Sequence, residues 1–178
     1  MGRPREILQK ISSWGANILI FVSVGTHTQQ FNRLLKEIDK LKEQTVLKEK
    51  IFAQTGFSKY KPKNFQYKKF ISPKEFNILI KKADLFITHG GAGSIGAALQ
   101  LNKKIIIVPR LKKFYEHTND HQLELAKKLE EEGKAIAVLR INDLKDAIKK
   151  IKFFNPKREE KGGKIIKLIE GFLSEKMA

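Results

Sequence analysis

The chain has 178 residues, of which 41% are hydrophobic and 31% charged, a balance typical of a single folded domain rather than a disordered chain. The absence of cysteine excludes disulfides, thiolate catalysis and cysteine-based zinc sites. The formal net charge of +17 indicates an anionic partner or surface without specifying which one.

Residues 1–17 predict an N-terminal amphipathic extension, because Ile7, Leu8, Ile11 and Trp14 recur at helical spacing among basic residues. Such a helix would pack on its own domain or lie on a membrane surface. The chain contains no apolar run of about 18 residues and no secretory signal pattern follows Met1, so we expect a cytoplasmic protein. Residues 18–178 are expected to form one domain that ends in a C-terminal helix.

The first predicted element of the domain is a strand over residues 17–24, where a nearly continuous apolar run fits a strand buried on both faces. A helix is expected from about 30 to 42, and strands at 50–54 and 66–71. Ser72, Pro73 and Glu75 together predict an N-cap, a first-turn proline and a capping box. They would open a helix that ends near Lys82.

The second half continues the alternation of strands and helices. The expected elements are a strand at 84–88, a glycine loop at 89–93, a helix at 94–101, a strand at 104–108, a helix from 119 or 120 to 132, a strand at 135–139, and helices at 142–151 and 165–173. This alternation predicts an α/β, Rossmann-like parallel sheet with helices on both faces. Ligands of such sheets bind at the carboxyl ends of the strands, which selects the loops 25–30, 89–94 and 110–122.

The glycine loop contains a literal GxGxxG match over residues 91–96. It follows a strand and opens a helix whose first N–H groups would favour an anion such as a diphosphate. The match does not lie in the first βαβ unit, and the next strand ends in Pro109-Arg110 rather than in an acid. An NADP site that uses Arg110 remains an alternative, and so does a turn that needs glycine only for its shape.

The segment 116–122 gathers acidic, amide and imidazole side chains at the end of an apolar strand. His117 and His121 have the spacing of two metal ligands on one helix, but the candidate N-cap at Asn119 falls between them. Recognition of sugar hydroxyls suits this set better than a metal, and we expect no metal or other cofactor.

Four segments together resemble the C-terminal domain of glycosyltransferase family 28, in particular its small PssE-like subunits and the eukaryotic subunit that adds the second GlcNAc to dolichol diphosphate. They are VGTHTQQF (24–31), QTGFSKY (54–60), ITHGGAGSIGAAL (87–99) and VPRLKKFYEHTNDHQLELAKKL (108–129). The resemblance covers roughly residues 18–150. It implies the donor-binding half of a GT-B glycosyltransferase: an inverting hexosyltransferase that uses a UDP-sugar and no metal.

The resemblance also implies roles for individual residues. Nucleotide and diphosphate contacts are expected at Gly25, Thr26, His89, Gly90, Gly91, Gly93, Ser94 and Arg110, and donor-sugar contacts at Glu116, His117, Asp120, His121 and Gln122. His27 is the catalytic candidate, on the side of the leaving group. Many members carry a ribose-binding Glu at the position of Ala97, and this chain departs from them there.

The expected partner is a membrane-anchored subunit that holds a lipid-linked sugar acceptor, which would place this chain at the cytoplasmic face of the membrane. Without that partner a homodimer is an alternative. Other functions that the sequence leaves open are an NADP-binding Rossmann protein, a non-catalytic subunit that stabilises its partner, and a basic nucleic-acid-binding module. Dispersed charge and the absence of a recognised nucleic-acid motif argue against the last.

Overall fold

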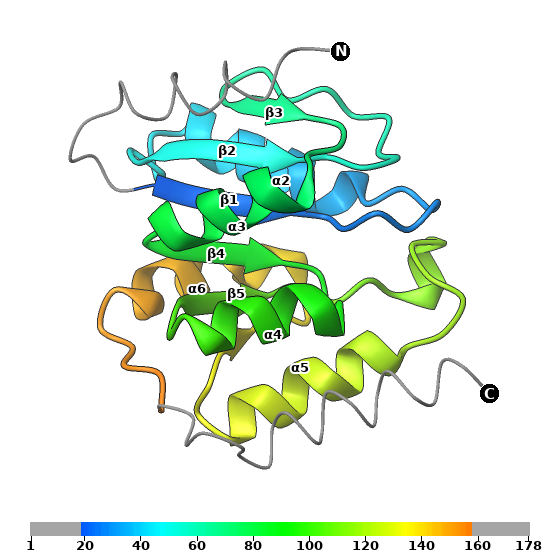
Figure 1. The fold of residues 1–178 in the computed structure, drawn as a ribbon. Coiled ribbons are helices and arrows are strands. Elements are labelled where there is room, and N and C mark those ends of the chain that lie inside the picture. Colours follow the sequence, from blue (N-terminus) through cyan, green and yellow to red (C-terminus); the bar gives the residue numbers. More distant parts are fainter. Residues whose placement is uncertain (1–18, 158–178) are drawn as a thin grey trace.

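The structure is a computed structural model that describes residues 19–157, in which six strands form one parallel sheet in the order β3-β2-β1-β4-β5-β6 (Figure 1). The strands are β1 (Leu19–Ser23), β2 (Lys50–Gln54), β3 (Gln66–Lys68), β4 (Leu85–Thr88), β5 (Lys104–Ile107) and β6 (Ile136–Ala137). All five strand pairs are parallel, which confirms the predicted sheet. The strand order reverses between β1 and β4, and such switch points are where open α/β sheets bind ligands.

Helices cover both faces of the sheet, as predicted. They are α2 (Asn32–Glu43), α3 (Pro73–Lys82), α4 (Ala92–Gln100), α5 (His121–Glu131) and α6 (Leu144–Ile151), with short 3-10 turns η1 (Lys112–Phe114) and η2 (Ile141–Asp143). The helices α3, α4 and α5 pack on one face, and α2 and α6 on the other (Figure 1). Among residues 19–157, no helix combines the length and the hydropathy that crossing a bilayer requires.

Strand β1 shows why the apolar runs are nearly continuous. Phe21 contributes to the core on the α3–α5 face and stacks on Phe86 with ring centroids 5.2 Å apart. Ile20 and Val22 contribute to the core on the α2 and α6 face. Because successive side chains of a strand point to opposite faces, a strand covered on both sides needs apolar residues at every position.

Local boundaries differ from the expected ones. The Ser72 capping box is present: Ser72 Oγ accepts the Glu75 N–H at 3.2 Å, and the Glu75 carboxylate accepts the Ser72 N–H at 2.8 Å. Helix α4 begins at Ala92, two residues before the expected start, and the strand expected at 66–71 ends at Lys68. The predicted extension 1–17 and helix 165–173 lie outside the described residues.

Candidate functional site

The three loops selected from the sequence meet at the carboxyl edge of the sheet. They follow β1, β4 and β5, and they contain all the residues for which a binding or catalytic role is expected. Figure 1 shows this edge, where the chain leaving β1 and the η1 segment extend from the same side of the sheet. The tertiary structure therefore brings the candidate residues to one end of the molecule, as the parallel topology requires.

The imidazole of His89 fills the space between the loops after β1 and β4. The ring is buried, with 8% of the residue exposed, and Nδ1 lies 3.4 Å from the Ser23 carbonyl oxygen and 3.3 Å from Thr88 Oγ1. A Cβ added to Gly25 or to Gly91 would overlap the ring. Both glycines are therefore required by packing, whatever ligand the site binds.

Gly90 is required for a similar reason, because a Cβ there would overlap Gln122. The Gln122 amide oxygen accepts hydrogen bonds from the backbone N–H groups of Gly90 and Arg110, each at 3.1 Å. The side chain is buried and links the loops after β4 and β5. Its amide oxygen is therefore engaged by these loops, and the expected contact with the donor sugar stays a prediction for its amide NH2 group.

Gly93 differs from the other glycines of this loop, because a Cβ placed on it would meet nothing within 4 Å among the described residues. It lies in the first turn of α4, and no side chain from residues 19–157 caps that helix. Ser94 follows and is half-buried. The uncapped N–H groups and the partial positive charge of a helix start attract anions, so the open space at Gly93 suits a phosphate group.

Arg110 occupies a different place from the one expected. The residue is fully buried, and its guanidinium donates hydrogen bonds to four backbone carbonyls, those of Val24, Gln29, Gln30 and Glu116, at 2.7 to 3.2 Å. Burial lowers the pKa of Arg110 to about 10, opposed by the charge of Glu116. Arg110 joins the loops after β1 and β5, and the expected contact with a nucleotide is not supported.

Glu116 is also committed to the interior. Its two carboxylate oxygens accept hydrogen bonds from Arg33 of α2 at 3.0 and 2.8 Å, and one of them accepts the Leu111 N–H at 3.2 Å. Glu116 is 1% exposed, so the expected contact with the sugar is not supported. Nothing in the spacing of the sequence pairs Arg33 with Glu116, and this ion pair was missed.

Two histidines from different loops lie against each other at this edge. The rings of His27 and His117 have centroids 4.9 Å apart. His117 is buried and its Nδ1 accepts the Asn119 N–H at 3.3 Å, whereas His27 is half-buried and Thr26 beside it is exposed. The structure therefore brings the catalytic candidate His27 next to one residue of the expected sugar-binding set.

Asp120 and His121 are the members of that set with exposed side chains. Asp120 precedes the first residue of α5 but does not cap it, and its Oδ1 instead accepts the Lys112 N–H at 2.9 Å. His121 Nδ1 lies 3.4 Å from a Glu124 carboxylate oxygen. His117 lies outside the helix that begins at His121, as expected, and no cluster of three metal-ligating side chains occurs within the described residues.

Cavities occur elsewhere on the molecule as well. One of about 590 Å³ lies at the amino edge of the sheet, and Asp84, Lys103 and Lys104 line it together with apolar side chains. None of the candidate site residues contributes to its lining. The candidate site is at the carboxyl edge, because in a parallel sheet the loops that follow the strands and the first turns of the next helices lie there.

The sheet order, the switch point and the glycine turn that opens α4 define a Rossmann-like domain of the kind that forms half of a GT-B glycosyltransferase. The model of the family described as "Glycosyltransferase family 28 C-terminal domain" matches residues 19–170. The chain belongs to this family, and the resemblance found in the sequence is confirmed.

Comparisons with individual proteins agree with that assignment. The human UDP-N-acetylglucosamine transferase subunit ALG13 is 48% identical over 54 residues, which are 30% of this chain and 4% of that protein. An NMR structure of ALG13 superposes with a TM-score of 0.55 at 17% identity, covering 80% of this chain and 88% of that one. The crystal structure of Acinetobacter baumannii MurG gives a TM-score of 0.54 at 20% identity, covering 81% and 44%.

A further likeness is to the glycotransferase of kitacinnamycin, with a TM-score of 0.58 at 22% identity, covering 77% of this chain and 35% of that one. At such identities, the structural likeness shows the fold. The chain spans only a small part of the curated human relative and about a third of this glycotransferase.

Proposed function

We propose that the chain is the donor-binding half of an inverting glycosyltransferase that uses a UDP-sugar. The observation that carries this proposal is the open space at Gly93, in front of the uncapped start of α4 and at the switch point of the sheet. The family assignment supports a transferase, and the name of the human relative supports a UDP-linked donor.

In the proposed reaction, an acceptor hydroxyl oxygen forms a bond to the anomeric carbon of the sugar while the bond from that carbon to the diphosphate oxygen breaks. UDP leaves with the electron pair of the broken bond. The N–H groups at the start of α4 and the backbone of Gly25 and Thr26 would stabilise the negative charge that develops on the diphosphate. His27, in the same loop, would act on the leaving-group side.

The acceptor proton needs a general base, and we place that base on a second polypeptide that also binds the acceptor. The human relative is named as a subunit, which supports a two-chain enzyme. We propose that the second chain is membrane-anchored and presents a lipid-linked sugar at the cytoplasmic face of the membrane. In its absence, this chain would bind the donor but transfer sugar slowly or not at all.

The donor sugar would be contacted by Asp120 and His121, whose side chains are exposed at the edge of the site. Glu116 and the amide oxygen of Gln122, which are buried and engaged, would hold the loops that carry these two residues. The NADP alternative loses its main support, because the guanidinium of Arg110 is engaged by four carbonyls.

Calorimetric titration of the purified chain tests the proposal. The ligands are UDP, UDP-GlcNAc, UDP-glucose, UDP-glucuronate and NADPH, each with and without EDTA to test the expectation that no metal is needed. Gly93→Leu would fill the open space and weaken UDP binding at least tenfold. Gln100→Leu, at the exposed far end of the same helix, is the matched control and should leave binding unchanged.

Each outcome distinguishes between the candidate functions. UDP binding that Gly93→Leu removes and Gln100→Leu keeps supports the donor half. NADPH binding without UDP binding would contradict it and favour the dinucleotide alternative. If UDP fails to bind even when the chain is co-purified with an acceptor subunit, the chain is a non-catalytic stabilising subunit.

A further inference from the structure

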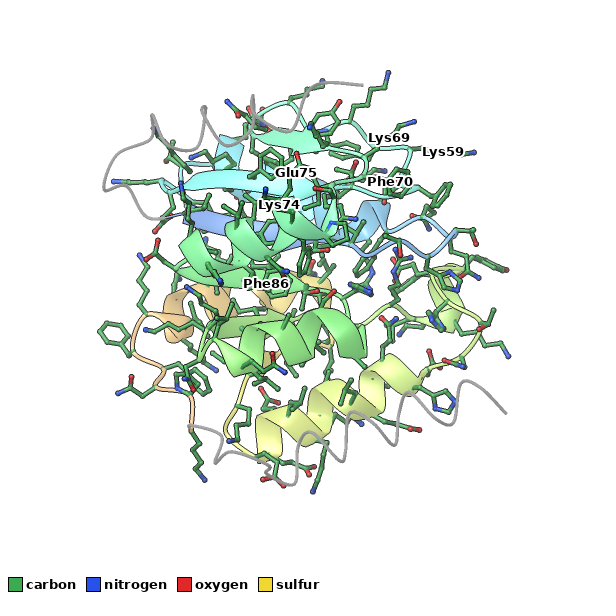
Figure 2. The ribbon with its side chains drawn as sticks, in the orientation of Figure 1. Lys59, Lys69, Phe70, Lys74, Glu75 and Phe86 are labelled. Carbon is green, nitrogen blue, oxygen red and sulfur yellow. The ribbon has the colours of Figure 1, made fainter. Side chains whose placement is uncertain are left out.

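Two aromatic rings are exposed beyond the carboxyl ends of β2 and β3. Phe57 is 49% exposed and Phe70 is 44% exposed, and their rings make an edge-to-face contact with centroids 5.1 Å apart. Lys59 and Lys69 are exposed in the segments that carry these rings, and Lys74 is exposed in the first turn of α3. Figure 2 shows Lys59, Lys69 and Phe70 together at one corner of the molecule, with Lys74 nearer the start of α3. We call these five residues the Phe–Lys surface.

The segment that carries the Phe–Lys surface is positively charged. Residues 55–74 contain lysines at positions 59, 61, 63, 68, 69 and 74 and no acidic residue. The nearby acids are engaged: Glu75 is bound to Ser72 and lies 3.4 Å from Lys68, and Asp39 accepts hydrogen bonds from Tyr60 and from the Lys63 and Asn64 N–H groups. Within residues 19–157, none of the three lysines of the surface forms an ion pair.

The Phe–Lys surface is held by backbone contacts rather than carried on a free loop. The Thr55 and Gly56 N–H groups donate to the Lys68 and Lys69 carbonyls at 2.9 and 2.8 Å, which fixes the two phenylalanine-bearing segments against each other. A Cβ at Gly56, whose φ is +53°, would lie 2.5 Å from the Gly25 carbonyl oxygen. The surface is therefore adjacent to the loop after β1, beside the candidate site.

We propose that the Phe–Lys surface binds directly to an anionic lipid bilayer. Phenylalanine rings partition into the interfacial region of a membrane, and lysines at the same level are attracted to anionic headgroups. A neutral partner would match the apolar rings but leave the lysines without counter-charges, so charge complementarity favours the anionic membrane. Membrane binding goes beyond donor binding and needs no sugar nucleotide. The proposed function enters only in one respect: a bilayer bound at this surface would hold the candidate site close to a lipid-linked acceptor.

A vesicle-binding assay tests the proposal. The full chain is mixed with vesicles of phosphatidylcholine alone or of phosphatidylcholine with about a quarter phosphatidylglycerol, without any partner or sugar nucleotide, and bound protein is quantified by sedimentation. Lys59→Gln with Lys69→Gln should weaken binding to the anionic vesicles roughly thirtyfold. Phe57→Ser with Phe70→Ser should weaken it about tenfold or more.

Matched controls are needed, because any protein with a charge of +17 is attracted to anionic lipid. Lys145→Gln with Lys150→Gln removes the same charge from the exposed side of α6, and Phe153→Ser removes a ring that is 91% exposed. Both controls should bind vesicles with less than threefold change. Thermal unfolding of every variant separates a loss of binding from a loss of fold.

Tryptophan fluorescence then locates the contact independently of net charge. The chain has one native tryptophan, so Trp14→Phe provides a silent background. In that background, the fluorescence emission of Phe70→Trp should shift to shorter wavelength on vesicle binding and be quenched by brominated lipids. The emission of Phe153→Trp should not change.

Three results would overturn the inference. One is a wild-type chain that does not bind the anionic vesicles. Another is a set of α6 controls that lose as much binding as the Phe–Lys variants. The third is a Phe–Lys variant that keeps vesicle binding but no longer co-purifies with an acidic partner subunit, which would assign the surface to protein contact. UDP titration of the same variants tests the donor site separately, so the two proposals fail independently.

Discussion

The imidazole of His89 occupies the space that a side chain on Gly25 would need. These residues follow neighbouring strands, β4 and β1, and their contact closes the switch point of the sheet. The same ring also blocks a side chain on Gly91. Three of the four glycines expected to contact a diphosphate, at positions 25, 90 and 91, thus have a packing requirement, and only Gly93 faces open space.

Gly91→Ala should destabilise the protein through a clash with the His89 ring. Gly91 has φ of −78°, so alanine brings no backbone strain there, and overpacking should lower the free energy of unfolding by about 1–3 kcal/mol. Denaturant unfolding of Gly91→Ala, His89→Ala and the double variant measures the coupling between the two positions. Additive losses in the double variant would contradict a clash with this ring.

Gly93→Ala, unlike Gly91→Ala, should not destabilise the protein. Because a Cβ at this position meets nothing within 4 Å in the part of the chain that the structure describes, and alanine favours helices, the free energy of unfolding should stay constant or rise by up to about 1 kcal/mol. UDP affinity should fall, since the methyl group would enter the proposed diphosphate space. A variant with unchanged UDP affinity would place the ligand away from α4.

Gln122→Met should lower the free energy of unfolding by about 2–4 kcal/mol, because the buried N–H groups of Gly90 and Arg110 lose their acceptor. Gln122→Glu keeps an oxygen that can accept both N–H groups and is the matched control, with a smaller expected loss. Equal losses in the two variants, measured by urea unfolding, would show that the hydrogen bonds contribute little.

His121→Ala should leave stability within about 0.5 kcal/mol of the wild type, because its side chain is exposed. If His121 contacts the donor sugar, affinity for the preferred UDP-sugar should fall about threefold to tenfold, a loss typical of one hydrogen bond, while affinity for UDP stays constant. Calorimetry with both ligands makes this comparison. A similar loss of affinity for UDP would indicate that His121 contacts the nucleotide instead of the sugar.

Asp39 should make the free energy of unfolding depend on pH in the acid range, and Tyr60 should do so in the alkaline range. Burial opposes ionisation of Asp39, but hydrogen bonds from Tyr60, Lys63 and Asn64 outweigh it and lower the pKa of its carboxyl below 3.8. The hydrogen bond to Asp39 raises the pKa of Tyr60 from 10.0 to about 12. Asp39 therefore stabilises the fold above its ordinary pKa, and this contribution is lost as the pH falls through the lowered value.

The contribution of Tyr60 is present below pH 10 and is lost as the pH rises toward 12. Relative to wild type, Tyr60→Phe should flatten the alkaline loss of stability, and Asp39→Asn should flatten the acid loss. Denaturant unfolding across a pH series measures both slopes. Wild-type slopes in both variants would mean that other groups dominate.

Much of the fold was predictable because its signals are local. Apolar runs marked the strands, helical periodicity marked α2, and Ser72 with Glu75 marked the start of α3. The parallel sheet followed from the alternation of these elements, since parallel neighbours need crossovers. The short β6 and the early start of α4 were less predictable, because hydrogen bonding across the sheet and to the preceding turn sets those boundaries.

The sequence by itself determined the fold class, the family resemblance and the three loops of the site, because strand ends and glycine turns are properties of short segments. Only the tertiary structure decided which side chains in those loops are available to a ligand. Arg110, Glu116 and Gln122 look suited to ligands in the sequence, but each satisfies buried groups that lie close only after folding. A buried polar group must find a partner wherever the chain places one, and spacing along the sequence does not encode that choice.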